Sequence, residues 1–250
     1  MTEYLVRHTG LARAVHWAHT IATITLFYTG IAIYTAGTNF LVGGPGGVAV
    51  SVWVHRGAAI VFIAAPLLGI IVRPSGLKHL FKALLKPWDK EDWLWTKRFV
   101  PHLVVARKVH LPPHNGEIKA GQRVASLGMI AFSVLIVITG FMLWFDGQTA
   151  AGAVRWAVLL HELSMMFLGV LLLGHIYLGA GIFQPLRGMI YTMFGNGKIS
   201  YRDAQFNWPV WAEEQAAVQR QAEQTETQGS WKPRSVGEPG FESPSRAEES

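Results

Sequence analysis

The chain has 250 residues, of which 50% are hydrophobic and only 15% are charged, and its formal net charge is +6. This composition favours a membrane protein. The sequence contains no cysteine, which excludes disulfides, cysteine-ligated iron–sulfur clusters and c-type haem attachment. We attribute the positive charge to loops that face anionic membrane lipid, and we expect no nucleic-acid partner.

Long uncharged runs predict four membrane-spanning helices, because about 20 apolar residues are enough to cross the hydrocarbon core of a bilayer. The first run, residues 14–55, is too long for one helix. We divide it at Gly43-Gly44-Pro45-Gly46-Gly47, since Gly and Pro are poor helix formers. The predicted spans are residues 14–36, 51–72, 123–145 and 154–183.

Lys and Arg are distributed unevenly among the predicted loops. The segment between the second and third spans is rich in both, whereas residues 37–50 carry no charge and residues 146–153 carry one acid and no Lys or Arg. Cytoplasmic loops of membrane proteins hold an excess of Lys and Arg. We therefore expect both termini and the long middle segment to be cytoplasmic.

The segments outside the spans have contrasting patterns. From Leu77 to Lys86, apolar residues and lysines fall on opposite faces of a helix, which we expect to lie along the inner membrane surface. The chain from Glu213 onward is rich in Gln, Glu and Ser. The predicted fold is an all-α membrane protein, with a four-transmembrane-helix bundle and cytoplasmic interfacial helix in residues 1–211 and a disordered tail in residues 212–250.

Four histidines lie in the predicted spans at matched depths. His175 follows His161 by fourteen residues, nearly four helical turns, so both lie on one helix face about 21 Å apart. The directions of the spans place His55 level with His161, near the outer surface, and His16 level with His175, near the inner one. Ionisable side chains are costly to place inside a membrane, so each of these histidines indicates a functional site. We predict that each pair supplies two axial nitrogens to a b-type haem.

Each assignment has an alternative. A membrane histidine can be an interhelical hydrogen-bonding group, and His19 competes with His16 because it lies three residues further along the same helix face. Arg13, Arg56 and Arg155 lie at the ends of predicted spans. They could bind haem propionates bidentately, or they could extend to the lipid headgroups.

Several short motifs resemble the cytochrome b (gamma) subunit of respiratory formate dehydrogenases. The similarity covers most of residues 7–211, apart from sections of 74–115, and the histidine set is shared with cytochrome b subunits of nickel–iron hydrogenases. The resemblance implies a multi-pass protein of the bacterial inner membrane with two haem b groups, which transfers electrons and does not itself oxidise formate. The motifs are Arg13-Ala14-Val15-His16-Trp17, His55, Leu159-Leu160-His161, Gly174-His175-Ile176-Tyr177, Arg187-Gly188-Met189-Ile190, Gly197-Lys198-Ile199-Ser200 and Trp208-Pro209-Val210-Trp211.

The resemblance also implies partners and an electron acceptor. An iron–sulfur beta subunit and an alpha subunit with a molybdenum or tungsten pterin would lie on the outer side. Menaquinone or ubiquinone would be reduced near the inner haem. In the family, an Asn-Ala-Gly-Gln motif helps to form the quinone pocket. Here residues 119–122 read Lys-Ala-Gly-Gln, so Gly121 and Gln122 carry over and the Asn contact does not.

Alternatives to these implications remain open on the sequence. Gly121 and Gln122 could simply begin a helix. A nickel–iron hydrogenase cytochrome b would hold the same haems but have a different external partner. A haem-free transporter or membrane scaffold would need another use for its intramembrane histidines.

Overall fold

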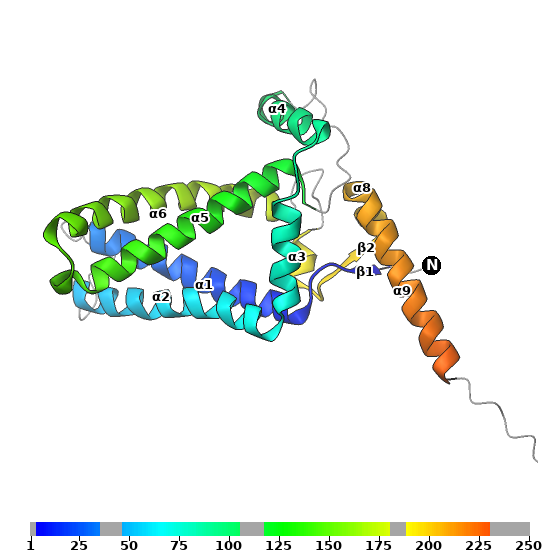
Figure 1. Cartoon of the computed structure of the whole chain (residues 1–250), viewed down its shortest axis with the longest axis horizontal. Coiled ribbons are helices and arrows are strands. Elements are labelled where there is room, and N and C mark those ends of the chain that lie inside the picture. The colour runs from blue at the N-terminus through cyan, green and yellow to red at the C-terminus, as the bar shows by residue number, and fades with distance from the viewer. Residues whose placement is uncertain (1–3, 36–46, 106–117, 181–188, 231–250) are drawn as a thin grey trace, which may run out of the picture.

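Two long helical hairpins make up most of the computed structural model, which describes residues 4–35, 47–105, 118–180 and 189–230. In each hairpin the two helices pack along one another, and Figure 1 shows the hairpins side by side along the long axis of the molecule. The first hairpin consists of α1 (Gly10–Tyr34) and α2 (Gly47–Val72), and the second of α5 (Ala120–Trp144) and α6 (Ala151–Gly179).

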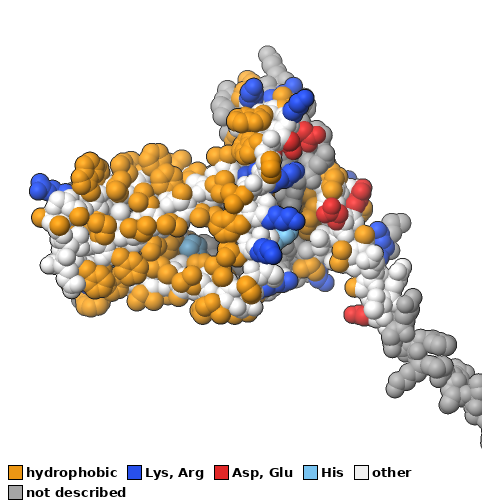
Figure 2. Space-filling model, viewed as in Figure 1, with side chains coloured by type: hydrophobic (Ala, Val, Ile, Leu, Met, Phe, Trp, Pro, Cys, Tyr) orange, Lys and Arg blue, Asp and Glu red, His pale blue; other side chains and the backbone are white. Residues whose placement is uncertain are grey.

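Three of these helices, α2, α5 and α6, are long and apolar enough to cross a membrane. The prediction of an all-α membrane protein is confirmed to that extent. The first predicted span coincides with α1, but α1 carries two histidines and several threonines that lower its hydropathy, so its membrane crossing remains a prediction. Figure 2 shows hydrophobic side chains covering the visible face of both hairpins, as expected for a surface in contact with lipid.

The segment between the hairpins forms two further helices. α3 (Pro74–Leu84) crosses one end of the bundle in Figure 1 and overlaps the helix expected over residues 77–86, with Pro74 in its first turn. Its location on a membrane surface remains a prediction. α4 (Lys90–Val104) begins with a capping box in which Asp89 and Asp92 each accept a hydrogen bond from the other's backbone amide. Figure 2 shows Lys and Arg side chains gathered at this end of the bundle.

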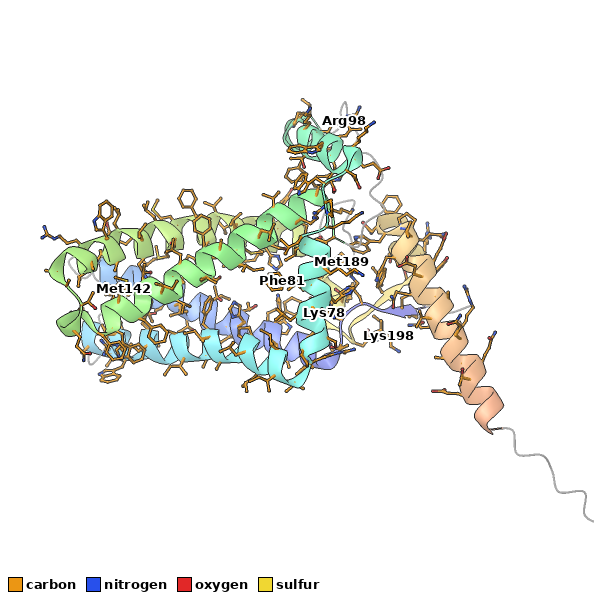
Figure 3. The ribbon with its side chains drawn as sticks, viewed as in Figure 1. Lys78, Phe81, Arg98, Met142, Met189 and Lys198 are labelled. Carbon is orange, nitrogen blue, oxygen red and sulfur yellow. The ribbon has the colours of Figure 1, made fainter. Side chains whose placement is uncertain are left out.

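A small sheet, which the sequence did not predict, lies at the same end of the bundle. β1 (Tyr4–Val6) pairs antiparallel with β2 (Lys198–Ser200), and Gly197 before β2 accepts hydrogen bonds from the amides of Arg7 and His8 through its carbonyl oxygen. Gly197 has a φ of 82°, and an added Cβ would overlap the carbonyl oxygen of His8, so this position requires glycine. Figure 3 shows Lys198 and Met189 at this end and Met142 at the other.

The segment after α6 continues as α7 (Ile190–Phe194), α8 (Tyr201–Asn207) and α9 (Pro209–Ser230), which corrects the expectation of a disordered tail from residue 212. The beginning of α9 is ordered by burial in a cluster formed with the small sheet and α8. Its members are Leu5, Ile199, Ala204, Trp208, Trp211, Ala212 and Ala216. The rest of the expected tail, residues 231–250, lies outside the described residues.

Candidate cofactor site between the helices

The predicted outer pair of histidines meets between the two hairpins. His55 projects from the first half of α2 and His161 from the first half of α6, both toward the end of the bundle remote from α3. Their ring centroids lie 6.5 Å apart with an angle of 57° between the ring planes. The structure therefore brings together two residues that are 106 positions apart in the sequence.

The predicted inner pair meets near the opposite end of the bundle. His16 projects from the second turn of α1 and His175 from the last turns of α6, with ring centroids 6.2 Å apart and an angle of 45° between the planes. Trp17, next to His16, donates a hydrogen bond to the carbonyl oxygen of Met193 at 3.1 Å and packs on Phe194. The α7 segment therefore covers this end of the site.

The spacing of both pairs fits coordination of a single metal ion by two rings. Two imidazoles that bind a metal from opposite sides through bonds of about 2 Å have centroids about 6 Å apart. Among the described residues, no group of three or more His, Asp or Glu lies close enough together to hold a metal ion. Two facing histidines also match the ligand number of a haem, in which a macrocycle supplies the other ligands of the iron.

Two threonines contact the outer pair, and the sequence analysis did not identify them. The hydroxyl of Thr29 lies 2.8 Å from Nδ1 of His55, and the hydroxyl of Thr139 lies 2.9 Å from Nδ1 of His161. Both threonines are almost fully buried. A signal was present in the sequence, since each precedes a glycine in the second half of a predicted span, as Thr29-Gly30 and Thr139-Gly140.

The glycine in each Thr-Gly pair leaves room for a histidine ring. A Cβ added to Gly140 would lie 3.3 Å from Cε1 of His161, and one added to Gly30 would lie 3.5 Å from Cε1 of His55. Between the two histidine levels, Phe27 of α1 lies against Gly169 of α6, where an added Cβ would be 3.1 Å from the phenyl ring. The hairpins therefore approach each other closely between the two pairs.

Comparison with known proteins decides the family to which this arrangement belongs. The family model described as prokaryotic cytochrome b561 matches residues 7–196. The chain belongs to this family. The resemblance stated from the sequence motifs is confirmed, and a cytochrome b family implies haem b as the cofactor.

Curated relatives carry names consistent with this family. The formate dehydrogenase cytochrome b556 subunit of Haemophilus influenzae is 26% identical over 221 residues, which cover 84% of this chain and 83% of the relative. The cytochrome b556 subunit of the nitrate-inducible formate dehydrogenase of Escherichia coli is 24% identical over 225 residues, covering 85% and 92% respectively. The chain is thus a cytochrome b561-family membrane subunit homologous to formate dehydrogenase cytochrome b556 subunits.

The histidine that competes with His16 has a different partner in this cytochrome. His19 lies 3.0 Å from the carbonyl oxygen of Phe62 through Nδ1 and stacks on the Phe62 ring. That carbonyl has no backbone donor four residues later, because residue 66 is proline, which lacks an N–H group. His19 therefore donates the hydrogen bond that Pro66 cannot, as neighbouring helices commonly do in membrane proteins.

The three arginines predicted near the haem propionates have protein contacts. Arg13 donates a hydrogen bond to the carbonyl oxygen of Gly195 in the segment after α7. Arg56 places its guanidinium 5.6 Å from the Trp53 ring centroid and 5.0 Å from that of Trp144. Arg155 lines a pocket with Gly152, Trp156 and Leu159. Propionate binding by these arginines remains a prediction.

The predicted quinone residues lie at the beginning of α5. The face of Gly121 is covered by the indole of Trp95 from α4, and an added Cβ would lie 2.5 Å from that ring. Gln122 is exposed. Lys119, which replaces the family's Asn, lies 5.7 Å from the Trp208 ring centroid, and burial lowers the pKa of its ammonium group. Quinone binding by Gly121 and Gln122 remains a prediction.

Proposed function

We propose that this chain is the di-haem cytochrome b membrane-anchor subunit of a respiratory formate dehydrogenase. One observation carries the proposal: His55 faces His161 and His16 faces His175 at ring separations of 6.5 and 6.2 Å, which fit two bis-histidine haems. The names of the relatives support formate dehydrogenase over nickel–iron hydrogenase. A cytochrome b of a nickel–iron hydrogenase and a haem-free transporter are the alternatives.

In this proposal the protein holds and spaces the two redox centres. When bound, each haem supplies an iron that accepts and returns one electron. α6 contributes one ligand to each centre, and the fourteen residues between His161 and His175 set a rise of about 21 Å. Because one helix carries a ligand of each centre, the distance between the two centres along the membrane normal is fixed. If each histidine pair held one haem as proposed, the two rings would leave no position at the iron for oxygen.

We further propose that four helices, α1 included, cross the inner membrane, with α3 lying along its cytoplasmic surface. The exposed lysines of α3, such as Lys78 and Lys82, support this orientation. β1 and α9 lie at the same end of the molecule as α3 in Figure 1, as expected if both termini are cytoplasmic. Reporter fusions after Lys108 and Gln221 should be active in the cytoplasm, and a fusion after Ala150 on the outer side. The reverse pattern would contradict this orientation.

The proposed partners follow from this orientation. An iron–sulfur beta subunit and an alpha subunit with a molybdenum or tungsten pterin would bind on the outer side, where His55 and His161 lie. The exposed Trp53 and Trp156 and the pocket at Arg155 lie at this end of the bundle and offer contact surface. Bilayer lipid would surround the apolar faces of α2, α5 and α6.

Purification of the native complex tests the function directly. The expected product contains two b haems per copy of this chain, with low-spin absorption spectra, together with the iron–sulfur and pterin subunits, and formate reduces both haems. A nickel–iron subunit in place of the pterin subunit would support the hydrogenase alternative. A chain free of haem after mild extraction would contradict both cytochrome proposals.

We also propose that menaquinone or ubiquinone is reduced near the inner pair, with Gln122 as a hydrogen-bond donor to a quinone carbonyl. Gln122 is exposed at the start of α5, whereas the buried indole of Trp95 covers Gly121, so the proposal rests on Gln122. In the intact complex, Gln122→Leu should leave both haems reducible by formate but slow their reoxidation by quinone, on the order of tenfold for one lost hydrogen bond. Stopped-flow reoxidation measures this rate, and a wild-type rate would locate the quinone elsewhere.

A further inference from the structure

The two buried threonines beside the outer pair suggest a role for this chain's own residues in tuning that centre. We infer that Thr29 and Thr139 are positioning residues that fix the ring tautomers of His55 and His161 and raise the basicity of the ring nitrogens facing the metal. This inference rests on the proposed function, because it concerns the outer haem of that proposal.

The threonine hydroxyls are held as acceptors toward the rings. Each hydroxyl donates its own hydrogen to the carbonyl oxygen four residues earlier in its helix: Thr29 to Thr25 at 2.7 Å, and Thr139 to Leu135 at 2.8 Å. A hydroxyl has a single hydrogen to donate. Each oxygen can therefore only accept from the adjacent histidine Nδ1, which must carry a proton.

The protonation of Nδ1 fixes the tautomer of each ring. With the proton of His55 and of His161 on Nδ1, directed at the threonine oxygen, Nε2 is deprotonated and free to bind a metal.

The arrangement occurs twice, once in each hairpin. In the first, Thr29 and Gly30 of α1 face His55 of α2; in the second, Thr139 and Gly140 of α5 face His161 of α6. Two separate helix pairs thus present the same combination of histidine donor, threonine acceptor and adjacent glycine. This repetition indicates that the metal-binding histidine pair requires the arrangement. Packing alone would not need a hydroxyl at both positions, because valine has nearly the same shape.

The inner pair has a weaker arrangement of this kind. The only hydrogen bond to His16 among the described residues joins Nδ1 and the hydroxyl of Thr20 in the same helix, at 3.5 Å, longer than an ordinary hydrogen bond. Hydrogen bonding from Nδ1–H to an acceptor makes an imidazole a stronger electron donor and stabilises the oxidised metal. The threonines would therefore lower the potential of the outer centre specifically.

The test uses valine substitutions in the purified complex with potentiometric titration of each haem. Thr29→Val and Thr139→Val should each raise the potential of the outer haem and leave the inner haem unchanged. In the double variant the ratio of reduced to oxidised outer haem at fixed potential should rise roughly tenfold, equivalent to about 59 mV for one electron. The electron paramagnetic resonance spectrum of the oxidised outer haem should shift with it.

Matched variants separate hydrogen bonding from shape. Thr25→Val is the control, because the side-chain hydroxyl of Thr25 donates to the carbonyl oxygen of Ile21 in the same helix, and the backbone carbonyl that accepts from Thr29 is kept in the variant. Thr29→Ser and Thr139→Ser keep the hydroxyl and should retain the wild-type potential. If a valine variant loses the outer haem and the serine variant keeps it, the inference is also supported.

Three results would overturn the inference. They are an unchanged outer potential and resonance spectrum in the double valine variant, equal shifts in both haems, or serine variants that behave like the valine ones. If the wild-type protein holds two haems, any of these three results would overturn the inference but leave the proposed function intact. Absence of haem from the wild type would overturn both.

Discussion

A His161→Ala variant should lose the outer haem and keep the inner one. The ring of His161 lies 6.5 Å from that of His55, whereas the inner pair of His16 and His175 lies about 21 Å further along α6. Removing one axial ligand leaves its partner facing an open side of the site. The haem content of the purified protein should fall by about half, as measured by the pyridine haemochrome spectrum, with loss of one midpoint potential.

The other histidines provide the controls for this pairing. His55→Ala should reproduce the loss caused by His161→Ala, and His16→Ala should reproduce the loss caused by His175→Ala. His19→Leu should keep both haems, because its ring bonds to the Phe62 carbonyl. Loss of the same centre in His55→Ala and His175→Ala would falsify the pairing.

The sequence predicted the helical hairpins and the histidine pairs because both depend on patterns within one helix. Apolar runs in a membrane protein fix helix positions, and α2, α5 and α6 begin only three or four residues before the predicted spans. The fourteen-residue spacing of His161 and His175 fixes their common face. Because successive spans run in opposite directions, the position of each histidine within its span gives its depth. This places His55 level with His161 and His16 level with His175.

The remaining features depend on contacts between distant segments, which a pattern within one helix does not reveal. β1 and β2 are three residues each and pair across nearly the whole chain, so neither has a strand signal of its own. α9 has a polar composition, and only the burial of Ala212 and Ala216 against the sheet cluster orders its start. The partners of Thr29 and Thr139 lie on neighbouring helices.

A substitution of Arg123 should destabilise the end of the bundle at α3 and α4 more than any other single charge change that we propose. Arg123 and Asp92 are 2% and 1% exposed, and their side chains form an ion pair at 2.9 Å. Arg123 also donates to the carbonyl oxygens of Leu84 and Lys86, and its guanidinium lies 5.3 Å from the Trp88 ring centroid. It thus joins the end of α3 and the start of α4 to α5.

Arg123→Met should lower the free energy of unfolding by about 3 to 5 kcal/mol, since it leaves the Asp92 carboxylate buried without its partner. Unfolding in detergent, induced by heat or by sodium dodecyl sulfate, measures the change. The matched control is Arg98→Met on α4 (Figure 3), because Arg98 is exposed and its substitution should change stability by less than about 0.5 kcal/mol.

A second substitution tests whether the buried charge is the cause. Asp92→Asn in the Arg123→Met background removes the carboxylate charge while keeping an oxygen that can accept from the Asp89 amide. It should restore part of the lost stability. Both haems should remain in all of these variants, because the Arg123 partners are Asp92 and two backbone carbonyls rather than any of the four paired histidines. Equal stability of Arg123→Met and Arg98→Met would mean that the ion pair does not hold α3 and α4 on the bundle, and loss of haem in Arg123→Met would connect this ion pair to the inner histidine pair.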